Sequence, residues 1–289
     1  MPKGLLRMRQ YTHRIRQLSM TLFLVLGAAV SLPAQNHTGW SSAGTLIVVT
    51  FARDGIAIGT DTAMNVSDTE TRKLQPLKTG AIAMTGASIV TGGPGQRLLI
   101  VDLIERWIKI HPTADADSAS KQLPASLERS INQFIQRNKL THSSPLDADD
   151  SRFDLIFIGL VQQRPYLTTV KFFESPVGPT MYYTTTAIQV GTVHAFGIPI
   201  VCDGILHHST PKALTQYEAA FSKLRGRIGA MSAVEALEVC RICLEASESV
   251  EAHRHYPETL GIRGPNEFGT ITYNGGFRWH SLERPKTSK

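Results

Sequence analysis

The apolar residues of this chain follow two spacings, and these predict its secondary structure. Near-continuous apolar runs bounded by turn residues indicate strands that are buried on both faces. We predict strands at 44–51, 55–61, 73–77, 81–85, 153–161, 165–173, 182–196 and 268–273. Apolar residues that recur every three or four positions indicate helices at 98–110, 123–137, 212–228 and 232–251. In the second of these helices, Pro124 is tolerable only within the first turn.

The order of these elements predicts the fold class. Two early hairpins are followed by two helices, further strands, two more helices and a last strand. This order is typical of antiparallel sheets that are covered by helices. Because the strands are apolar on both faces, the sheets must stack with the helices outside. We therefore expect an α/β (α+β) fold, a four-layer α/β/β/α sandwich of two stacked antiparallel sheets. The Ser- and Asp-rich stretch 143–152 is expected to be a surface loop of one domain.

The first hairpin carries an acidic residue in an apolar strand. If Arg53-Asp54-Gly55 is a three-residue loop with Gly55 left-handed, Asp61 lies opposite Ile47, on the side of Thr45. A register slip of one residue would turn Asp61 to the opposite face. A buried carboxylate is costly unless it is paired, so Asp61 needs a cation.

The first 34 residues predict an export signal. A basic stretch at 3–16, a short apolar run at 20–30 and small residues at 31–35 indicate cleavage after about Ala34. The apolar run is too short to span a bilayer comfortably. We expect a periplasmic or secreted protein. The alternatives are an uncleaved membrane anchor, or a misassigned start and a cytoplasmic protein.

Composition and charge exclude several classes of protein. Of 289 residues, 42% are hydrophobic and 19% are charged, which argues against a disordered, collagen-like or polytopic membrane protein. The net charge of +6 comes largely from the leader, because five of the 30 Lys and Arg residues lie at 3–16 and the first acidic residue is Asp54. The remainder is nearly neutral, so we expect no nucleic-acid partner, and no membrane partner after signal removal.

The cysteines and histidines offer weak metal or redox signals. Cys240 and Cys243 lie three residues apart on a predicted helix, like half of a redox or metal site. Without a second such pair, two buried small apolar side chains are the favoured interpretation. The histidines at 207–208 and 253–255 lack carboxylate or cysteine at usual ligand spacing and are expected at the surface. We therefore expect no metal and no cofactor.

Three segments near the start of the predicted domain resemble a proteasome β-type subunit. They are Gly44-Thr45 at a strand start, DGIAIGTDT at 54–62 with a lysine after it, and GAIAMTGAS at 80–88. The segment 231–238 is similar to the opening of a later helix of that family. The resemblance covers 44 to about 281 and implies an N-terminal nucleophile hydrolase that is a threonine-type peptidase or amidohydrolase and a homo-oligomer. The chain then divides into a signal peptide at 1–34, a propeptide at 35–44 and a single hydrolase domain at 45–289.

The resemblance also implies a role for individual residues. The Gly44–Thr45 bond is cleaved autocatalytically, and Thr45 becomes the nucleophile. A threonine hydroxyl needs a base beside it, and the free α-amine of an N-terminal residue titrates near 8. Lys73 is the lysine that pairs with Asp61, and its ammonium favours deprotonation of the Thr45 hydroxyl. Gly86 supplies a backbone N–H to the oxyanion hole.

Some features leave alternatives open. Arg72 or Lys78 competes with Lys73 for Asp61. The family's supporting serine is expected near 196–199, where the sequence has none, and its later Asp and Ser correspond at best to Glu258 and Thr259. Two other functions therefore remain: a non-catalytic assembly or binding protein of the same fold, and an exported amidase that acts on small amides.

Overall fold

The computed structural model describes residues 38–42, 45–62, 72–93, 95–141, 151–175, 178–186, 188–263 and 265–281. The expected signal peptide and Gly44 lie outside the described residues, so the two cleavage sites stay predictions. In the described part of the chain, no helix is long and apolar enough to cross a membrane.

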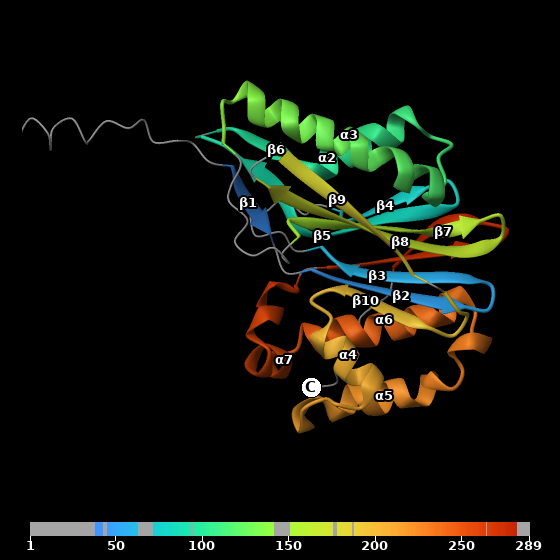
Figure 1. Cartoon of the computed structure of the whole chain (residues 1–289). Helices are drawn as coiled ribbons and strands as arrows, with labels where there is room; N and C mark the ends of the chain where they lie inside the picture. Colours follow the sequence, from blue (N-terminus) through green and yellow to red (C-terminus); the bar gives the residue numbers. More distant parts are fainter. Residues whose placement is uncertain are drawn as a thin grey trace, which may run out of the picture. The chain divides into compact units, whose positions relative to one another are not determined.

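The strands form two antiparallel sheets (Figure 1). The larger sheet has the strand order β1 (Gly39–Ser42), β5 (Gly80–Thr91), β7 (Phe153–Val161), β8 (Arg164–Ser175) and β9 (Gly178–Thr185). Two short strands, β4 (Leu74–Leu77) and β6 (Arg97–Leu99), also pair with β5. The smaller sheet has the order β10 (Val193–Gly197), β2 (Leu46–Ala52), β3 (Gly55–Asp61), β11 (Asn266–Thr272) and β12 (Gly276–His280).

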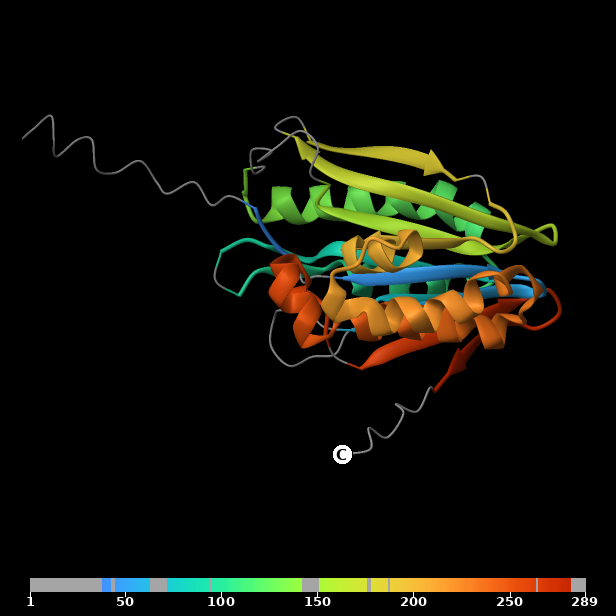
Figure 2. The ribbon, with the colours of Figure 1, turned by 90° about the horizontal axis from the view of Figure 1, so that it is seen from below.

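Helices cover the outer faces of the two sheets. They are α2 (Ile100–Ile110), α3 (Ala116–Arg137), α4 (Ile200–His207), α5 (Thr215–Arg225), α6 (Ala233–Ser247) and α7 (Val250–His255). Helices α2 and α3 lie over the larger sheet, and α4 to α6 lie over the smaller one (Figures 1 and 2). Short 3-10 turns at Lys212–Leu214 and Ile228–Ala230 lie between these later helices, and a third, Pro257–Gly261, lies between α7 and β11.

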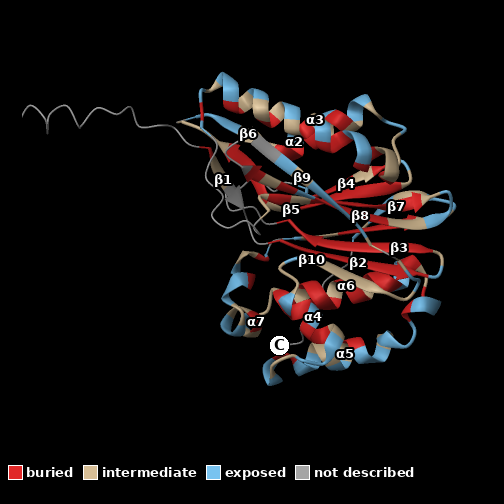
Figure 3. Cartoon of the chain, in the orientation of Figure 1, coloured by how far each residue is buried: buried red, intermediate tan, exposed pale blue. Residues whose placement is uncertain are grey.

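Three apolar cores separate these layers and explain the continuous apolar strands. Every residue of β2 and β3 is buried (Figure 3). Leu46 and Val48 pack toward α4 and α6, whereas Ile47 and Val49 pack between the two sheets. A third core lies between the larger sheet and helices α2 and α3. The expected α+β class with two stacked antiparallel sheets is therefore confirmed.

Several predicted element boundaries are wrong. The predicted strand at 182–196 is two strands, β9 and β10, which belong to different sheets. Helix α3 begins seven residues earlier than predicted, because Asp115 forms a capping box with Ser118, and Pro124 therefore lies inside the helix. Helix α4 was not predicted, and the predicted helix at 232–251 is divided into α6 and α7.

The predicted register of the first hairpin is also wrong by one residue. Ala52 pairs with Gly55 across a two-residue turn, and Ile47 therefore pairs with Thr60 instead of Asp61. Gly55 does not adopt a positive φ. A glycine is needed there because a Cβ would lie 2.1 Å from the carbonyl oxygen of Ile271, on the neighbouring strand β11.

One cysteine prediction needs correction. Cys243 of α6 forms a disulfide with Cys202 of α4, with Cα atoms 4.9 Å apart, so it is not simply an apolar filler. Cys240 is a buried free thiol, as the favoured interpretation had it. Among the histidines, 207, 208 and 255 are exposed and 253 is half-buried. Within the described ranges, no three potential metal ligands come together.

Candidate active site

Three polar side chains meet where β2 begins. Thr45 immediately precedes β2, Asp61 ends β3, and Lys73 immediately precedes β4. The Lys73 Nζ donates to Thr45 Oγ1 at 2.8 Å and to Asp61 Oδ2 at 3.0 Å. Their exposed fractions are 2% for Thr45, 0% for Asp61 and 3% for Lys73. The structure thus brings together three of the four predicted catalytic residues in one buried cluster.

The cluster forms in spite of the error in register. Asp61 lies one residue beyond the Ile47–Thr60 pair, at the end of the hairpin. Its Oδ1 accepts a hydrogen bond of 2.8 Å from the Leu46 backbone N–H. Because Asp61 is the last residue of β3, its carboxylate reaches its partners around the end of the strand pair. The error in the predicted register therefore does not prevent these contacts.

The backbone of Lys73 is anchored on β5, and this decides the competition for Asp61. The Lys73 carbonyl accepts a hydrogen bond of 3.1 Å from the Met84 N–H. Arg72 instead pairs with Glu267, with 3.3 Å between Nε and Oε1, and its guanidinium lies 5.1 Å from the Trp279 ring centroid. Lys78 is exposed in the turn between β4 and β5. Lys73 is thus the cation that pairs with Asp61.

Burial changes the proton affinities of this pair. Loss of solvation raises the pKa of Asp61, although the charge of Lys73 and the hydrogen bond from Leu46 oppose the change. Loss of solvation also lowers the pKa of Lys73, against the attraction of Asp61 and Glu267. At a given pH, the neutral form of Lys73 is therefore more populated than that of an exposed lysine, which suits a group that accepts a proton.

Gly86, the predicted oxyanion-hole residue, lies on β5 two residues after Met84. Its φ of +81° is in the region that favours glycine. A Cβ at this position would lie 2.7 Å from the Arg152 carbonyl oxygen. The close approach of this backbone at the start of β7 therefore excludes a side chain at Gly86.

Gly197 is a site residue that the sequence analysis did not identify. It has a φ of +88°, and a Cβ there would lie 2.0 Å from the Thr45 carbonyl oxygen. The N–H of Ile198 donates to the same oxygen at 2.8 Å. The segment 196–199 thus lies at Thr45, as the resemblance implies, but it contributes backbone where the family has a hydroxyl. The only signal in the sequence was the glycine in this segment.

The two other candidate supporting residues lie on the 3-10 turn Pro257–Gly261. Glu258 is exposed. Thr259 is buried, and its hydroxyl donates to the Tyr256 carbonyl at 2.7 Å. The Thr259 hydroxyl therefore donates to the backbone of the turn on which it lies.

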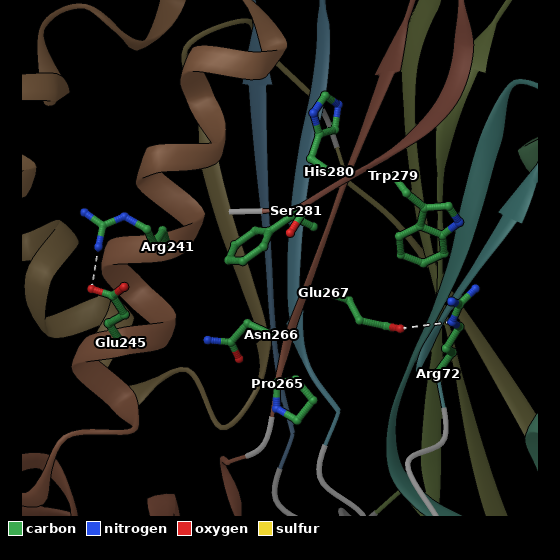
Figure 4. A pocket seen from close by; sticks show the side chains of 10 residues that line it. Arg72, Arg241, Glu245, Pro265, Asn266, Glu267, Trp279, His280 and Ser281 are labelled. Atoms are coloured by element: carbon green, nitrogen blue, oxygen red, sulfur yellow. Dashed lines mark hydrogen bonds and ion pairs between the residues drawn. The ribbon is translucent and has the colours of Figure 1, made fainter. Parts of the chain in front are cut away.

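A cavity of about 470 Å³ lies close to the cluster but does not include it (Figure 4). Its lining contains Arg72 and Glu267, which point toward each other, and Asn266, which pairs with Asp61 across the sheet. Thr45 is not among the residues that line it. Both of its arginines are ion-paired, Arg72 with Glu267 and Arg241 with Glu238 and Glu245. Among the described residues, the lining of this cavity therefore reaches the neighbours of Asp61 and Lys73 but not Thr45 itself.

Comparison of the chain with models of known protein families gives no match, and comparison with curated proteins gives none either.

Proposed function

We propose that this chain is a threonine-type N-terminal nucleophile hydrolase, a peptidase or amidohydrolase similar to a proteasome β subunit, that processes itself at Gly44–Thr45. The observation that carries the proposal is the buried contact of the Lys73 amine with both the Thr45 hydroxyl and the Asp61 carboxylate. The two stacked sheets, with the candidate nucleophile at the start of a central strand, support the N-terminal nucleophile hydrolase type.

In the unprocessed chain, the nitrogen of Thr45 is an amide and has no basicity. The neutral amine of Lys73 takes the hydroxyl proton while Thr45 Oγ1 attacks the carbonyl carbon of Gly44. The Gly44–Thr45 C–N bond then breaks, the nitrogen receives the proton, and an ester links Gly44 to Oγ1. Water hydrolyses this ester and releases Thr45 with a free α-amine.

In the processed chain, the new α-amine is the base, because it titrates near 8. Thr45 Oγ1 attacks the amide carbonyl of a substrate, and the ammonium of Lys73, held by Asp61, stabilises the developing negative charge. The Gly86 N–H is proposed to donate to the substrate oxyanion. The leaving amine takes the proton from the α-amine, and water hydrolyses the resulting ester.

Intact-mass analysis of purified variants tests this mechanism. We expect the wild-type protein to begin at Thr45, Thr45→Ala to keep the preceding residues and to hydrolyse nothing, and Thr45→Ser to retain part of both activities. Thr50→Ala is the matched control, because Thr50 is equally buried but its hydroxyl contacts Cys240. A wild-type chain that begins at Gln35, or full activity in Thr45→Ala, would overturn the proposal.

A non-catalytic assembly or binding protein is the second candidate function. It is favoured by the segment at Gly197, which gives Thr45 a backbone hydrogen bond and no hydroxyl. Chemical blocking of the Thr45 α-amine separates the two functions, since only a hydrolase loses an activity. An exported amidase would use the same residues, and a panel of small amides and peptides as substrates distinguishes it from a peptidase.

A further inference from the structure

The residues just before Thr45 lie along β5 as an edge strand. Strand β1 pairs antiparallel with β5, and its partners run from Ser42 with Ala87 to Gly39 with Thr91 (Figure 1). Ala87 directly follows Gly86. The edge of β5 next to the proposed oxyanion hole is therefore already paired with a peptide strand, which is the chain's own.

An aromatic side chain of this strand packs against two buried rings. The Trp40 ring centroid lies 6.2 Å from that of Phe153 and 6.1 Å from that of Phe172. Those two rings stack at 4.5 Å and are 1% and 2% exposed. We call Phe153 on β7 and Phe172 on β8 the ring floor, because they form an apolar surface against which the Trp40 ring packs.

A buried carboxylate lies beside this floor. The Glu174 side chain is 1% exposed, and its Oε2 lies 3.6 Å from the Arg152 Nε. The same Oε2 accepts a hydrogen bond of 2.5 Å from the Trp40 indole Nε1, and Oε1 accepts one of 2.8 Å from the Thr38 hydroxyl. A buried charge needs such donors, and two of those that Glu174 uses belong to the segment ahead of Thr45.

We propose that Glu174, Arg152, Phe153 and Phe172 form a substrate subsite that selects a tryptophan side chain. The ligand is a peptide that adds a strand along β5, with its tryptophan five residues before the cleaved bond, as Trp40 is placed relative to Gly44–Thr45. Backbone pairing along β5 is open to many sequences, whereas the ring floor and the acceptor for a ring N–H supply the selectivity. The inference rests on the proposed hydrolase function and deepens it, because it makes the substrate an extended peptide and not a small amide.

A binding experiment on the full chain tests the subsite. In a Thr45→Ala background, Thr38→Ala and Trp40→Ala together withdraw the side chains that fill the subsite. They also remove the side-chain contacts that hold β1 on β5, so that an added peptide can displace this four-residue edge strand. Calorimetry then compares the peptide acetyl-Thr-Gly-Trp-Ser-Ser-amide with the same peptide carrying phenylalanine in place of tryptophan. We expect the tryptophan peptide to bind at least tenfold more tightly, because phenylalanine keeps the ring and lacks the N–H donor. The parent Thr45→Ala chain, whose own Trp40 occupies the subsite, should bind the tryptophan peptide at least tenfold more weakly.

Two controls make the outcome decisive. Both peptides meet the same protein, so a folding defect cannot produce a difference between them. Glu174→Gln, added to the vacated chain, should reduce the preference for tryptophan, since it removes the charge of the acceptor. Equal affinity for the two peptides, or no binding of the tryptophan peptide, overturns the subsite. Because Thr45→Ala has no nucleophile, this result is independent of hydrolysis: selective binding without activity in the wild type would refute only the hydrolase, and processing without selective binding would refute only the subsite.

Discussion

Lys73 contacts two partners at once, and each contact has a measurable consequence. Its ammonium compensates the buried charge of Asp61, and its amine touches the Thr45 hydroxyl. Stability and the proposed self-processing should therefore depend on the same side chain but on different protonation states of it. Variants that remove the charge of Lys73 with or without its side-chain volume distinguish its role in stability from its role in proton transfer.

We expect Lys73→Ala to lower the free energy of unfolding by about 3–5 kcal/mol, because it leaves Asp61 buried without its cation. The double variant Lys73→Met/Asp61→Asn should recover most of this loss. It removes both charges, fills the volume and keeps an acceptor for the Leu46 N–H. Urea unfolding at neutral pH measures each value. A Lys73→Ala protein within about 1 kcal/mol of the wild type would contradict the role of Lys73 as the compensating charge.

The lowered pKa of Lys73 predicts how the proposed self-processing should depend on pH. Only the neutral amine accepts the Thr45 proton, so the processing rate should rise with pH as the ammonium deprotonates. Because burial lowers the pKa of Lys73, the midpoint of this rise should lie below the ordinary lysine value of 10.5. Refolding the unprocessed chain into buffers between about pH 6 and 10 measures the rate while the nitrogen of Thr45 is still an amide and the α-amine of Thr45 does not yet exist. A rate that falls as pH rises would exclude Lys73 as the base, and Lys73→Arg should not process because its guanidinium stays protonated.

At the scale of elements, the β2–β3 hairpin joins the sheet to the site. It carries Asp61 at its end, and Gly55 holds its turn against β11. A Cβ on Gly55 would meet the backbone oxygen of Ile271, a residue that the β3–β11 ladder prevents from moving away. Glycine is therefore required at position 55 because β11 leaves no room for a Cβ, and not because of the backbone conformation of Gly55.

We expect Gly55→Ala to destabilise the protein by about 2 kcal/mol or more, because the added methyl group collides with paired backbone. Gly226→Ala is the matched control. A Cβ at Gly226 meets no atom within 4 Å, and its φ of −71° suits alanine. The control should be neutral or stabilising by less than about 1 kcal/mol. Thermal and urea unfolding give both values, and equal effects of the two substitutions would disprove the steric explanation.

At the scale of the whole molecule, one edge of the larger sheet exposes aromatic side chains. Strand β9 ends that sheet in the described part of the chain, and Tyr182 and Tyr183 on it are 60% and 54% exposed. An edge strand with exposed rings is a surface that can pair with another copy. The nearly neutral charge of the chain beyond its leader does not oppose such contact.

We predict that the protein is a homo-oligomer and that β9 contributes to its interface. Light scattering at micromolar concentrations should report a mass above that of one chain. Tyr182→Glu/Tyr183→Glu should reduce this mass, because charges on the strand oppose its burial. Leu260→Glu is the control, since Leu260 is similarly exposed, at 58%, but lies on the turn before β11. A monomer at every concentration would refute the prediction.

The sequence by itself determined the types of the long elements and the stacking of the two sheets. Apolar runs such as 46–52 and 153–161 report burial on both faces, and that requirement admits few arrangements. The sequence also indicated that Asp61 needs a nearby cation, because it is a carboxylate in an apolar strand. The resemblance to the proteasome β-type family, and not this requirement, implied that Lys73 and Thr45 are its partners.

Tertiary structure decided the choices that depend on distant segments. The close approach of β11 requires glycine at position 55, at the turn of the first hairpin. Arg72 contacts Glu267 on β11 and Trp279 on β12, whereas Lys73 contacts Asp61. The disulfide joins cysteines 41 residues apart on α4 and α6. The proposed Glu174 subsite combines side chains of β1, β7 and β8, which come together only because β1 and β7 both pair with β5 and β8 pairs with β7. Periodicity in a sequence reports the local conformation and burial of each residue, whereas pairing depends on distances that only the assembled layers define.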